Sequence, residues 1–251
     1  MLFFRDFILL GIIACIGASF NTHAALTIER SRLIFNENDK SISVKVTNRN
    51  KKDPYLLQSW IENEKEEKII SSLMVLPPLQ RIEPGAKTLI RIEKMPDIDK
   101  LPKDRESVFY LNMREIPPKS EKKNVLTLAI QSRLKVFYRP DSIKVDSFLD
   151  SVPGTEMLTL TKKNGKYELA NPTPYYFSFV GGKNGLKGNE VKDFDPVMIS
   201  PKSKQNLPLS YEAYGDSPVL AFVNDYGSQR LLPFSCKGIM CTAGKPVSNR
   251  Q

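Results

Sequence analysis

The sequence predicts an all-β protein built from two β-sandwich domains. Short runs in which large apolar and polar residues alternate recur along the chain, and turn residues separate them every 8 to 12 residues or so, as is typical of β-sandwiches. No segment of useful length has the periodicity of an amphipathic helix. The length of 251 residues suggests two domains of roughly 110 residues rather than one.

Residues 1–24 differ from the rest of the chain and are interpreted as a secretory signal. Arg5 precedes an apolar run over residues 7–20, and small residues lead up to Ala24. The run is shorter than the ~20 residues that a membrane-spanning helix needs. We therefore expect cleavage after Ala24 and a soluble mature chain. The alternative, lipoprotein processing at Cys15, is less favoured because the apolar run continues past this residue.

Removal of this segment limits the chemistry of the mature chain. The only histidine, His23, leaves with the signal, which excludes a Ser-His-Asp site, a Cys-His site and a histidine metal site. The whole chain has 37 basic and 28 acidic residues, and loss of Arg5 and Asp6 leaves the net charge at +9. A basic balance fits nucleic acid, membrane or acidic partners, and export argues against nucleic acid. The sequence predicts no metal and no cofactor.

Two cysteines remain after Cys15 is lost. A lone pair in an exported chain is most simply a disulfide that closes a small loop, and here it joins Cys236 to Cys241. The spacing C-x4-C, without further cysteine or histidine, supplies too few ligands for a zinc site.

The first half of the mature chain contains a series of expected strands separated by turn residues and by the Pro77-Pro78 break. These strands cover residues 26–30, 32–35, 41–47, 55–61, 69–76, 79–82, 87–92 and 108–114. The charged cluster at 62–68 is interpreted as a solvated hairpin end.

One long strand is expected over residues 124–140. Three large aliphatic residues, Leu126, Leu128 and Ile130, alternate with small or polar ones, and Pro140 ends the run. Lys135 lies nine residues beyond Leu126, about 30 Å along a strand. An odd spacing places Lys135 on the face opposite the aliphatics, so a shared site requires a bulge, a twist or a cleft. By pattern alone, an ordinary core strand with a polar end is the simpler interpretation.

The second half resumes after a connector at 141–146. Its expected strands are 158–161, 166–170, 175–180, 197–199, 205–209, 220–224 and 229–234. The glycines between 181 and 188 lack the strand-to-helix setting of a phosphate-binding loop and are interpreted as turns.

Three separated motifs resemble the signature of the periplasmic pilus chaperones of the chaperone-usher pathway. They are DRESVFYLNMREIPP at 104–118, IQSRLKVFYRP at 130–140 and NDYG at 224–227, with Pro77-Pro78 and residues 81–85 as a fourth match. Together they span essentially the whole mature chain.

The resemblance implies two immunoglobulin-like domains in a boomerang arrangement, here residues 25–143 and 144–251, in a protein of the periplasm. Such a protein is not an enzyme. It binds, folds and caps pilus subunits by donor-strand complementation, and it delivers them to an outer-membrane usher.

The resemblance also implies roles for individual residues. Arg32 and Lys135 would hold the C-terminal carboxylate of a pilus subunit. The donor strand would present Leu126, Leu128 and Ile130 to a groove in a subunit whose own fold lacks its last strand.

Further matches concern the frame of the site. Glu106, Arg139 and Asp225 match a charged network across the domain junction, with the arginine between the two carboxylates. Cys236 and Cys241 match a disulfide found in part of the family. The short loop at 117–124 resembles the short-loop branch, which is associated with rod-like, adhesin-tipped pili.

Two other classes of protein were weighed. A secreted hydrolase lacks support because the mature chain has no histidine and no paired-carboxylate motif. An exported immunoglobulin-like adhesion protein or pilus structural subunit would share the fold, and it is the alternative function. The sequence leaves open whether the free protein associates with a second copy of itself.

Overall fold

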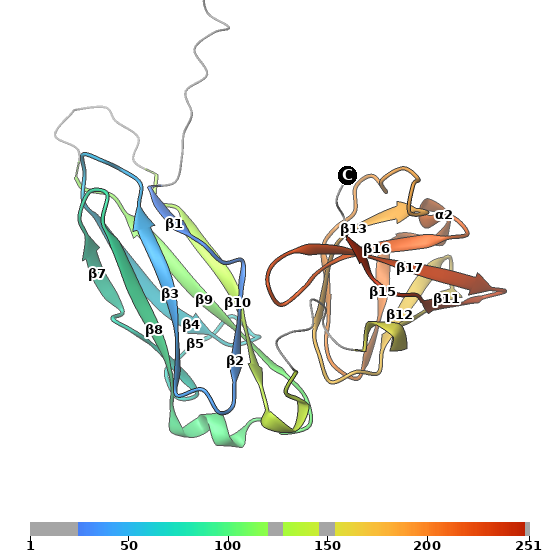
Figure 1. The fold of residues 1–251 in the computed structure, drawn as a ribbon, viewed down its shortest axis with the longest axis horizontal. Coiled ribbons are helices and arrows are strands. Elements are labelled where there is room, and N and C mark those ends of the chain that lie inside the picture. The colour runs from blue at the N-terminus through green and yellow to red at the C-terminus, as the bar shows by residue number, and fades with distance from the viewer. Residues whose placement is uncertain (1–24, 120–127, 146–153, 249–251) are drawn as a thin grey trace, which may run out of the picture.

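The protein is almost entirely β-structure, arranged as two sandwiches that lie side by side (Figure 1). This fold comes from a computed structural model that describes residues 25–119, 128–145 and 154–248. The predicted all-β, two-domain architecture is confirmed.

The first sandwich consists of two sheets. The four-stranded sheet has the order β1 (Leu26–Ile28), β3 (Ser41–Asn48), β8 (Lys87–Lys94) and β6 (Leu73–Leu76). The six-stranded sheet has the order β2 (Arg32–Asn36), β10 (Gln131–Arg139), β9 (Ser107–Ile116), β4 (Tyr55–Glu62) and β5 (Lys68–Ile69), and β7 (Leu79–Ile82) also pairs with β4. One 3-10 helix, η1, covers Pro96–Lys100.

Period-2 alternation builds the core between these sheets. On β10, Leu134 and Val136 are buried in this core, and on β4 it is Leu57 and Ile61 that point inward. The residues between them face the other side of the sheet, as the pleat requires. The outer face of β10 therefore carries Lys135, and this is the side on which the second sandwich lies.

The second sandwich is a continuous nine-stranded arrangement. Its path is β14 (Val197–Ile199), β13 (Phe177–Asn184), β16 (Pro218–Val223), β17 (Gln229–Lys237), β18 (Met240–Ala243), β11 (Thr159–Lys163), β12 (Lys166–Asn171) and β15 (Ser203–Ser210), with β19 (Val247–Ser248) paired to β17. Short helical turns are η2 (Asp141–Ile143), η3 (Thr155–Met157) and α2 (Tyr211–Tyr214).

Strand β17 holds the two layers of this sandwich together. Its first half pairs with β16, and its second half pairs with β18. A separate buried core fills the space between the layers, and its aromatic part contains Phe177, Phe179 and Phe222 in mutual ring contact.

The strand expected over 124–140 begins later in the structure, and this expectation was wrong for residues 128–130. β10 starts at Gln131, which pairs with Arg114 of β9. The last contact of this ladder is a hydrogen bond from Glu115 N to Ile130 O at 3.0 Å. Beyond Ile116, β9 is followed by two prolines, which have no N–H to donate, so the ladder ends. Leu126 falls within 120–127, outside the described residues.

Smaller differences concern strand ends. The run expected at 69–76 is divided into β5 and β6, and the sequence did not lead us to expect β18 or β19. Within the described ranges, no helix is long and apolar enough to cross a membrane. The same ranges contain no group of three or more His, Cys, Asp or Glu residues that could hold a metal.

Candidate functional site

Arg32 and Lys135 lie directly opposite each other on neighbouring strands. β2 and β10 run parallel, and Arg32 is the first residue of β2 and the register partner of Lys135. Side chains opposite each other on adjacent strands share a face of the sheet. The two cations that the sequence separates by about a hundred residues therefore form one cationic site at the beginning of β2.

Both cations are held by groups of the second sandwich. Arg32 Nη1 donates to the carbonyl oxygen of Val223 at 2.7 Å, and Lys135 Nζ donates to Ser178 Oγ at 3.1 Å. Arg32 is only 7% exposed, and its Nε has no hydrogen-bond acceptor among the described residues. A buried, unpartnered guanidinium N–H is costly to leave without an acceptor.

The electrostatics of this pair favour an anion. Burial lowers the pKa of Lys135, and the nearby charge of Arg32 lowers it further. Burial also lowers the pKa of Arg32, although Asp225 and Glu106 oppose that effect. In the part of the chain that the structure describes, no carboxylate forms an ion pair with either residue. Two like charges held together out of water attract an incoming carboxylate.

An open edge of β10 leads up to this cationic site. β2 pairs only with residues Lys135 to Arg139 of β10, because the preceding strand β1 belongs to the other sheet, where it pairs with β3. Among the described residues, the β2-side edge of β10 from Gln131 to Leu134 has no strand beside it. Such an edge presents unpaired N–H and C=O groups to an added strand.

Leu128 and Ile130, two of the residues expected to donate a strand, lie just before this edge. Leu128 is 70% exposed and Ile130 is 45% exposed, so both side chains are open to a partner. β10 itself alternates regularly. Its pairing with β9 runs without a register shift from Gln131 to Tyr138, so Lys135 faces away from the core side on which Leu134 and Val136 lie. A bound chain can therefore contact both the cationic site and the aliphatic residues before β10 only if it runs along the edge of β10. A chain that crossed one face of the sheet would reach only one of them.

The three residues expected to form a charged network are brought together at the junction of the sandwiches. Arg139 donates from Nε to Glu106 Oε1 at 2.9 Å and from Nη1 to Asp225 Oδ2 at 2.8 Å. The other oxygen of Glu106 accepts the backbone N–H of Tyr176 at 2.8 Å. Arg139 thus lies between two carboxylates that come from different sandwiches.

Burial and the mutual charges shift the pKa values of this network. Burial raises the pKa of Glu106 to about 7, against the opposing effects of Arg139 and of the Tyr176 N–H. Burial alone would lower the pKa of Arg139, but Glu106 and Asp225 outweigh it and raise that pKa. Arg139 therefore holds its proton more firmly than a solvated arginine.

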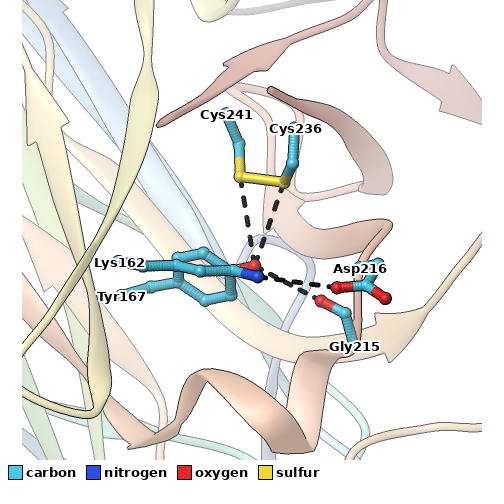
Figure 2. The surroundings of a disulfide bond; sticks show 6 residues. All are labelled: Lys162, Tyr167, Gly215, Asp216, Cys236 and Cys241. Carbon is cyan, nitrogen blue, oxygen red and sulfur yellow. Dashed lines mark hydrogen bonds and ion pairs between the residues drawn. A yellow bond between two sulfur atoms is a disulfide. The ribbon is translucent and has the colours of Figure 1, made fainter. Parts of the chain in front are cut away.

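The expected disulfide is present in the second sandwich (Figure 2). Cys236 and Cys241 are register partners in the β17–β18 hairpin, with an S–S distance of 1.96 Å. The hydroxyl of Tyr167 lies 3.9 Å from each sulfur and donates to the carbonyl oxygen of Gly215 at 3.3 Å. The disulfide thus belongs to the core of this sandwich and makes no contact with the cationic site.

The sequence analysis missed the groups that hold the two cations. Ser178 is one serine within a strand of aromatic residues, and Val223 contributes only a backbone carbonyl oxygen. Neither has a sequence signal of its own. Tyr176, which donates its backbone N–H to Glu106, was missed for the same reason.

Comparison with known proteins gives matches to two family models that lie between residues 25 and 233. Residues 25–144 match the family model described as "Pili and flagellar-assembly chaperone, PapD N-terminal domain". Residues 154–233 match the model described as "Pili assembly chaperone PapD, C-terminal domain".

Individual relatives agree with the family models. The chaperone protein PapD of Escherichia coli is 45% identical over 88% of this chain and 91% of its own length. The probable fimbrial chaperone YfcS of Escherichia coli (strain K12) is 44% identical over 93% of this chain and 92% of its own. The crystal structure of the periplasmic chaperone SfaE matches with a TM-score of 0.66 at 27% identity, covering 88% of this chain and 97% of that one. The chain therefore belongs to the PapD-like family of pilus chaperones.

Proposed function

We propose that this protein is a fimbrial chaperone that holds a pilus subunit by its C-terminal carboxylate and adds a strand to it. One observation carries the proposal. Arg32 and Lys135 lie where the unpaired edge of β10 ends and its pairing with β2 begins. The family membership and the fimbrial chaperone relatives support the same function. Nothing in the comparisons favours an adhesion protein or a structural subunit.

The chemistry of the site suits a terminal carboxylate. Arginine offers planar N–H groups that match the two oxygens of a carboxylate, and lysine adds a point charge. Because one N–H of Arg32 already binds Val223, the guanidinium cannot rotate freely, and the unpartnered Nε remains for the ligand. Charge-assisted hydrogen bonds of this kind are short and directional, so they fix where a bound chain ends.

The direction of the added strand follows from the position of β2. A chain that lies on the open edge of β10 with its C-terminus at Arg32 continues the line of β2, and β2 is parallel to β10. The subunit strand should therefore pair in parallel with β10 and with the residues before it. If the segment before β10 is extended when a subunit binds, Ile130, Leu128 and Leu126 would lie roughly 17, 23 and 30 Å from Lys135.

The donor side chains supply affinity and the cationic site supplies the register. Burial of three aliphatic side chains in a subunit groove contributes roughly 5 to 8 kcal/mol before the losses of association. Alternation alone would tolerate slips of two residues. A single carboxylate held by Arg32 and Lys135 prevents such slips, because it fixes the position of the last residue of the bound chain.

The proposal extends to location and to a second partner. The secretory signal expected at 1–24 directs the chain to the periplasm, where it would act without catalysis. Delivery of the subunit to an outer-membrane usher is the step that this function serves.

Co-purification from periplasm tests the proposal. Tagged protein is co-expressed with pilus subunits as wild type, Arg32→Ala and Lys135→Ala, with folding checked by circular dichroism. We expect subunit retention by wild type, and weakening by roughly 2 kcal/mol or more, a factor of about 30, in each variant. Lys87→Ala, an exposed lysine on β8 of the other sheet, is the matched control and should retain subunit. Normal retention by folded Lys135→Ala would refute the carboxylate anchor.

A further inference from the structure

The second sandwich reaches the cationic site at two points. Ser178 of β13 places its hydroxyl 3.1 Å from Lys135 Nζ, and Val223, the last residue of β16, accepts a hydrogen bond from Arg32. Neither contact belongs to the first sandwich, where both cations originate. The cationic site is thus assembled from two separately folded parts of the chain.

Packing fixes the Ser178 hydroxyl in place. Ser178 is only 2% exposed and lies between the buried residues Phe177 and Phe179, while its backbone is the register partner of Met198 on β14. Two residues earlier on the same segment, Tyr176 packs against Phe137 of β10, with 5.6 Å between the ring centroids. The strand that carries Ser178 is therefore held against the strand that carries Lys135.

The loop after Val223 is held just as closely. Gly227 has a φ of +84°, and a Cβ added there would lie 2.6 Å from the hydroxyl of Ser31, the neighbour of Arg32. Only glycine suits this backbone conformation and this close approach. The two sandwiches are thus in contact on both sides of the cationic site.

We infer that Ser178 is a positioning residue for the subunit carboxylate, so that the second sandwich completes the site. The inference rests on the proposed function. A lysine ammonium on a flexible stem has three rotatable donors, and one bond to a fixed acceptor limits where the other two point. The hydroxyl that accepts from Lys135 still has its own O–H to donate, and a carboxylate oxygen held by the same ammonium is a suitable acceptor.

This arrangement selects for a free carboxylate. All the groups that converge on the ligand position, from Arg32, Lys135 and Ser178, have an N–H or O–H to donate. A carboxylate accepts from each of them and brings a negative charge to the two cations, whereas a C-terminal amide is neutral and accepts only through its single carbonyl oxygen. Loss of the Ser178 hydroxyl should therefore weaken binding of the acid more than the weak binding of the amide.

The first test needs no ligand. The pKa of Lys135 is measured by NMR in the free protein for wild type, Ser178→Thr, Ser178→Val and Ser178→Ala. Threonine keeps the hydroxyl and valine replaces it with a methyl group of similar size. Because the hydroxyl accepts from the charged ammonium, we expect a lower pKa of Lys135 in the valine and alanine variants and a value near wild type with threonine. Ser203→Ala is the control. Ser203 lies on β15 and donates to Ser200 O at 2.8 Å, and its replacement should leave the pKa of Lys135 unchanged. An equal pKa of Lys135 in all variants would overturn the inference.

The second test measures binding. The probe is a synthetic peptide with the C-terminal sequence of a co-expressed pilus subunit, prepared as the free acid and as the amide. We expect about tenfold weaker binding of the acid by Ser178→Val and a smaller change for the amide. If Ser178→Val binds the acid as tightly as wild type while Lys135→Ala does not, this inference fails and the proposed function stands. If wild type binds the acid no more tightly than the amide, and Lys135→Ala binds each peptide as wild type does, the proposed function and this inference both fail.

Discussion

Arg139 and Glu106 form an ion pair of 2.7 Å between side chains that are only 4% and 2% exposed. The pair lies where the sandwiches meet, and Asp225 and the Tyr176 N–H join it from the other sandwich. The free energy of the junction therefore depends on charges that water cannot reach.

Arg139→Ala should destabilise the protein strongly. It leaves Glu106 buried without its cation, and removal of one partner of a buried ion pair costs roughly 3 to 5 kcal/mol. Chemical denaturation followed by circular dichroism measures this loss, and subunit binding should fall with it because the cationic site spans the junction. Arg81→Ala is the matched control, since Arg81 pairs with Glu83 at 2.6 Å in an exposed position. An equal effect of the two variants would contradict the junction role.

Lys135→Met should stabilise the free protein and abolish subunit binding. Lys135 is partly buried beside Arg32, and burial together with that positive charge lowers its pKa. Methionine has a similar length but no charge, so it is neither penalised by burial nor repelled by Arg32. We therefore expect the free energy of unfolding to rise by about 1 kcal/mol, or Tm by ~2–4 °C. Differential scanning calorimetry measures the gain. Lys87→Met, on an exposed surface, should leave Tm unchanged, and a lower Tm for Lys135→Met would show that the lysine is structural.

Subunit affinity should fall at alkaline pH. A carboxylate binds the protonated lysine, so affinity is independent of pH well below the pKa of Lys135 and declines up to tenfold per pH unit above it. Since that pKa is lowered in the free protein, the decline should begin below the ordinary lysine value of 10.5.

Lys135→Arg provides the comparison, because an arginine side chain stays protonated throughout this range. Titration of peptide binding from about pH 7 to about pH 10 should give a sloping curve for wild type and a flatter one for the variant. If the affinity of the two proteins fell in parallel with pH, the decline would come from the titration of a group other than Lys135.

Removal of the disulfide should reduce stability without reducing binding. The two cysteines are five positions apart, and a loop of this size corresponds to about 2 kcal/mol in the chain-entropy model. We expect the double variant Cys236→Ala/Cys241→Ala to unfold at lower denaturant concentration and, at moderate temperature, to bind subunit as wild type does. Weaker binding by the folded double variant would connect this hairpin to the site.

The fold could be predicted from the sequence because alternation and turn residues are local signals. Val44 and Val46 on β3, or Ile90 and Ile92 on β8, alternate with exposed or half-buried residues and are buried as that pattern predicts. The start of β10 could not be predicted in this way. Leu128 and Ile130 continue the alternation, but the neighbouring strand β9 ends before two prolines, and a pattern within one segment says nothing about the end of its neighbour.

The candidate site was only partly accessible to sequence reasoning. Arg32, Lys135 and the three junction residues were expected through a resemblance, and no periodicity or spacing would have selected them from 37 basic and 28 acidic residues. The structure adds their register and burial. The roles of Ser178 and the Val223 carbonyl could be recognised only from the structure. A contact between distant segments produces no pattern in the sequence of either segment.

The switch of the chain from β1 in one sheet to β2 in the other has a consequence for the length of a guest. A strand that follows the open edge of β10 reaches Arg32, and the next positions in the sheet are already filled by β2. We therefore expect the edge to take a chain that ends at Arg32 and to exclude one that continues in the plane of the sheet. A guest extended by a few residues should bind more weakly because β2 blocks the extension sterically, whatever its sequence.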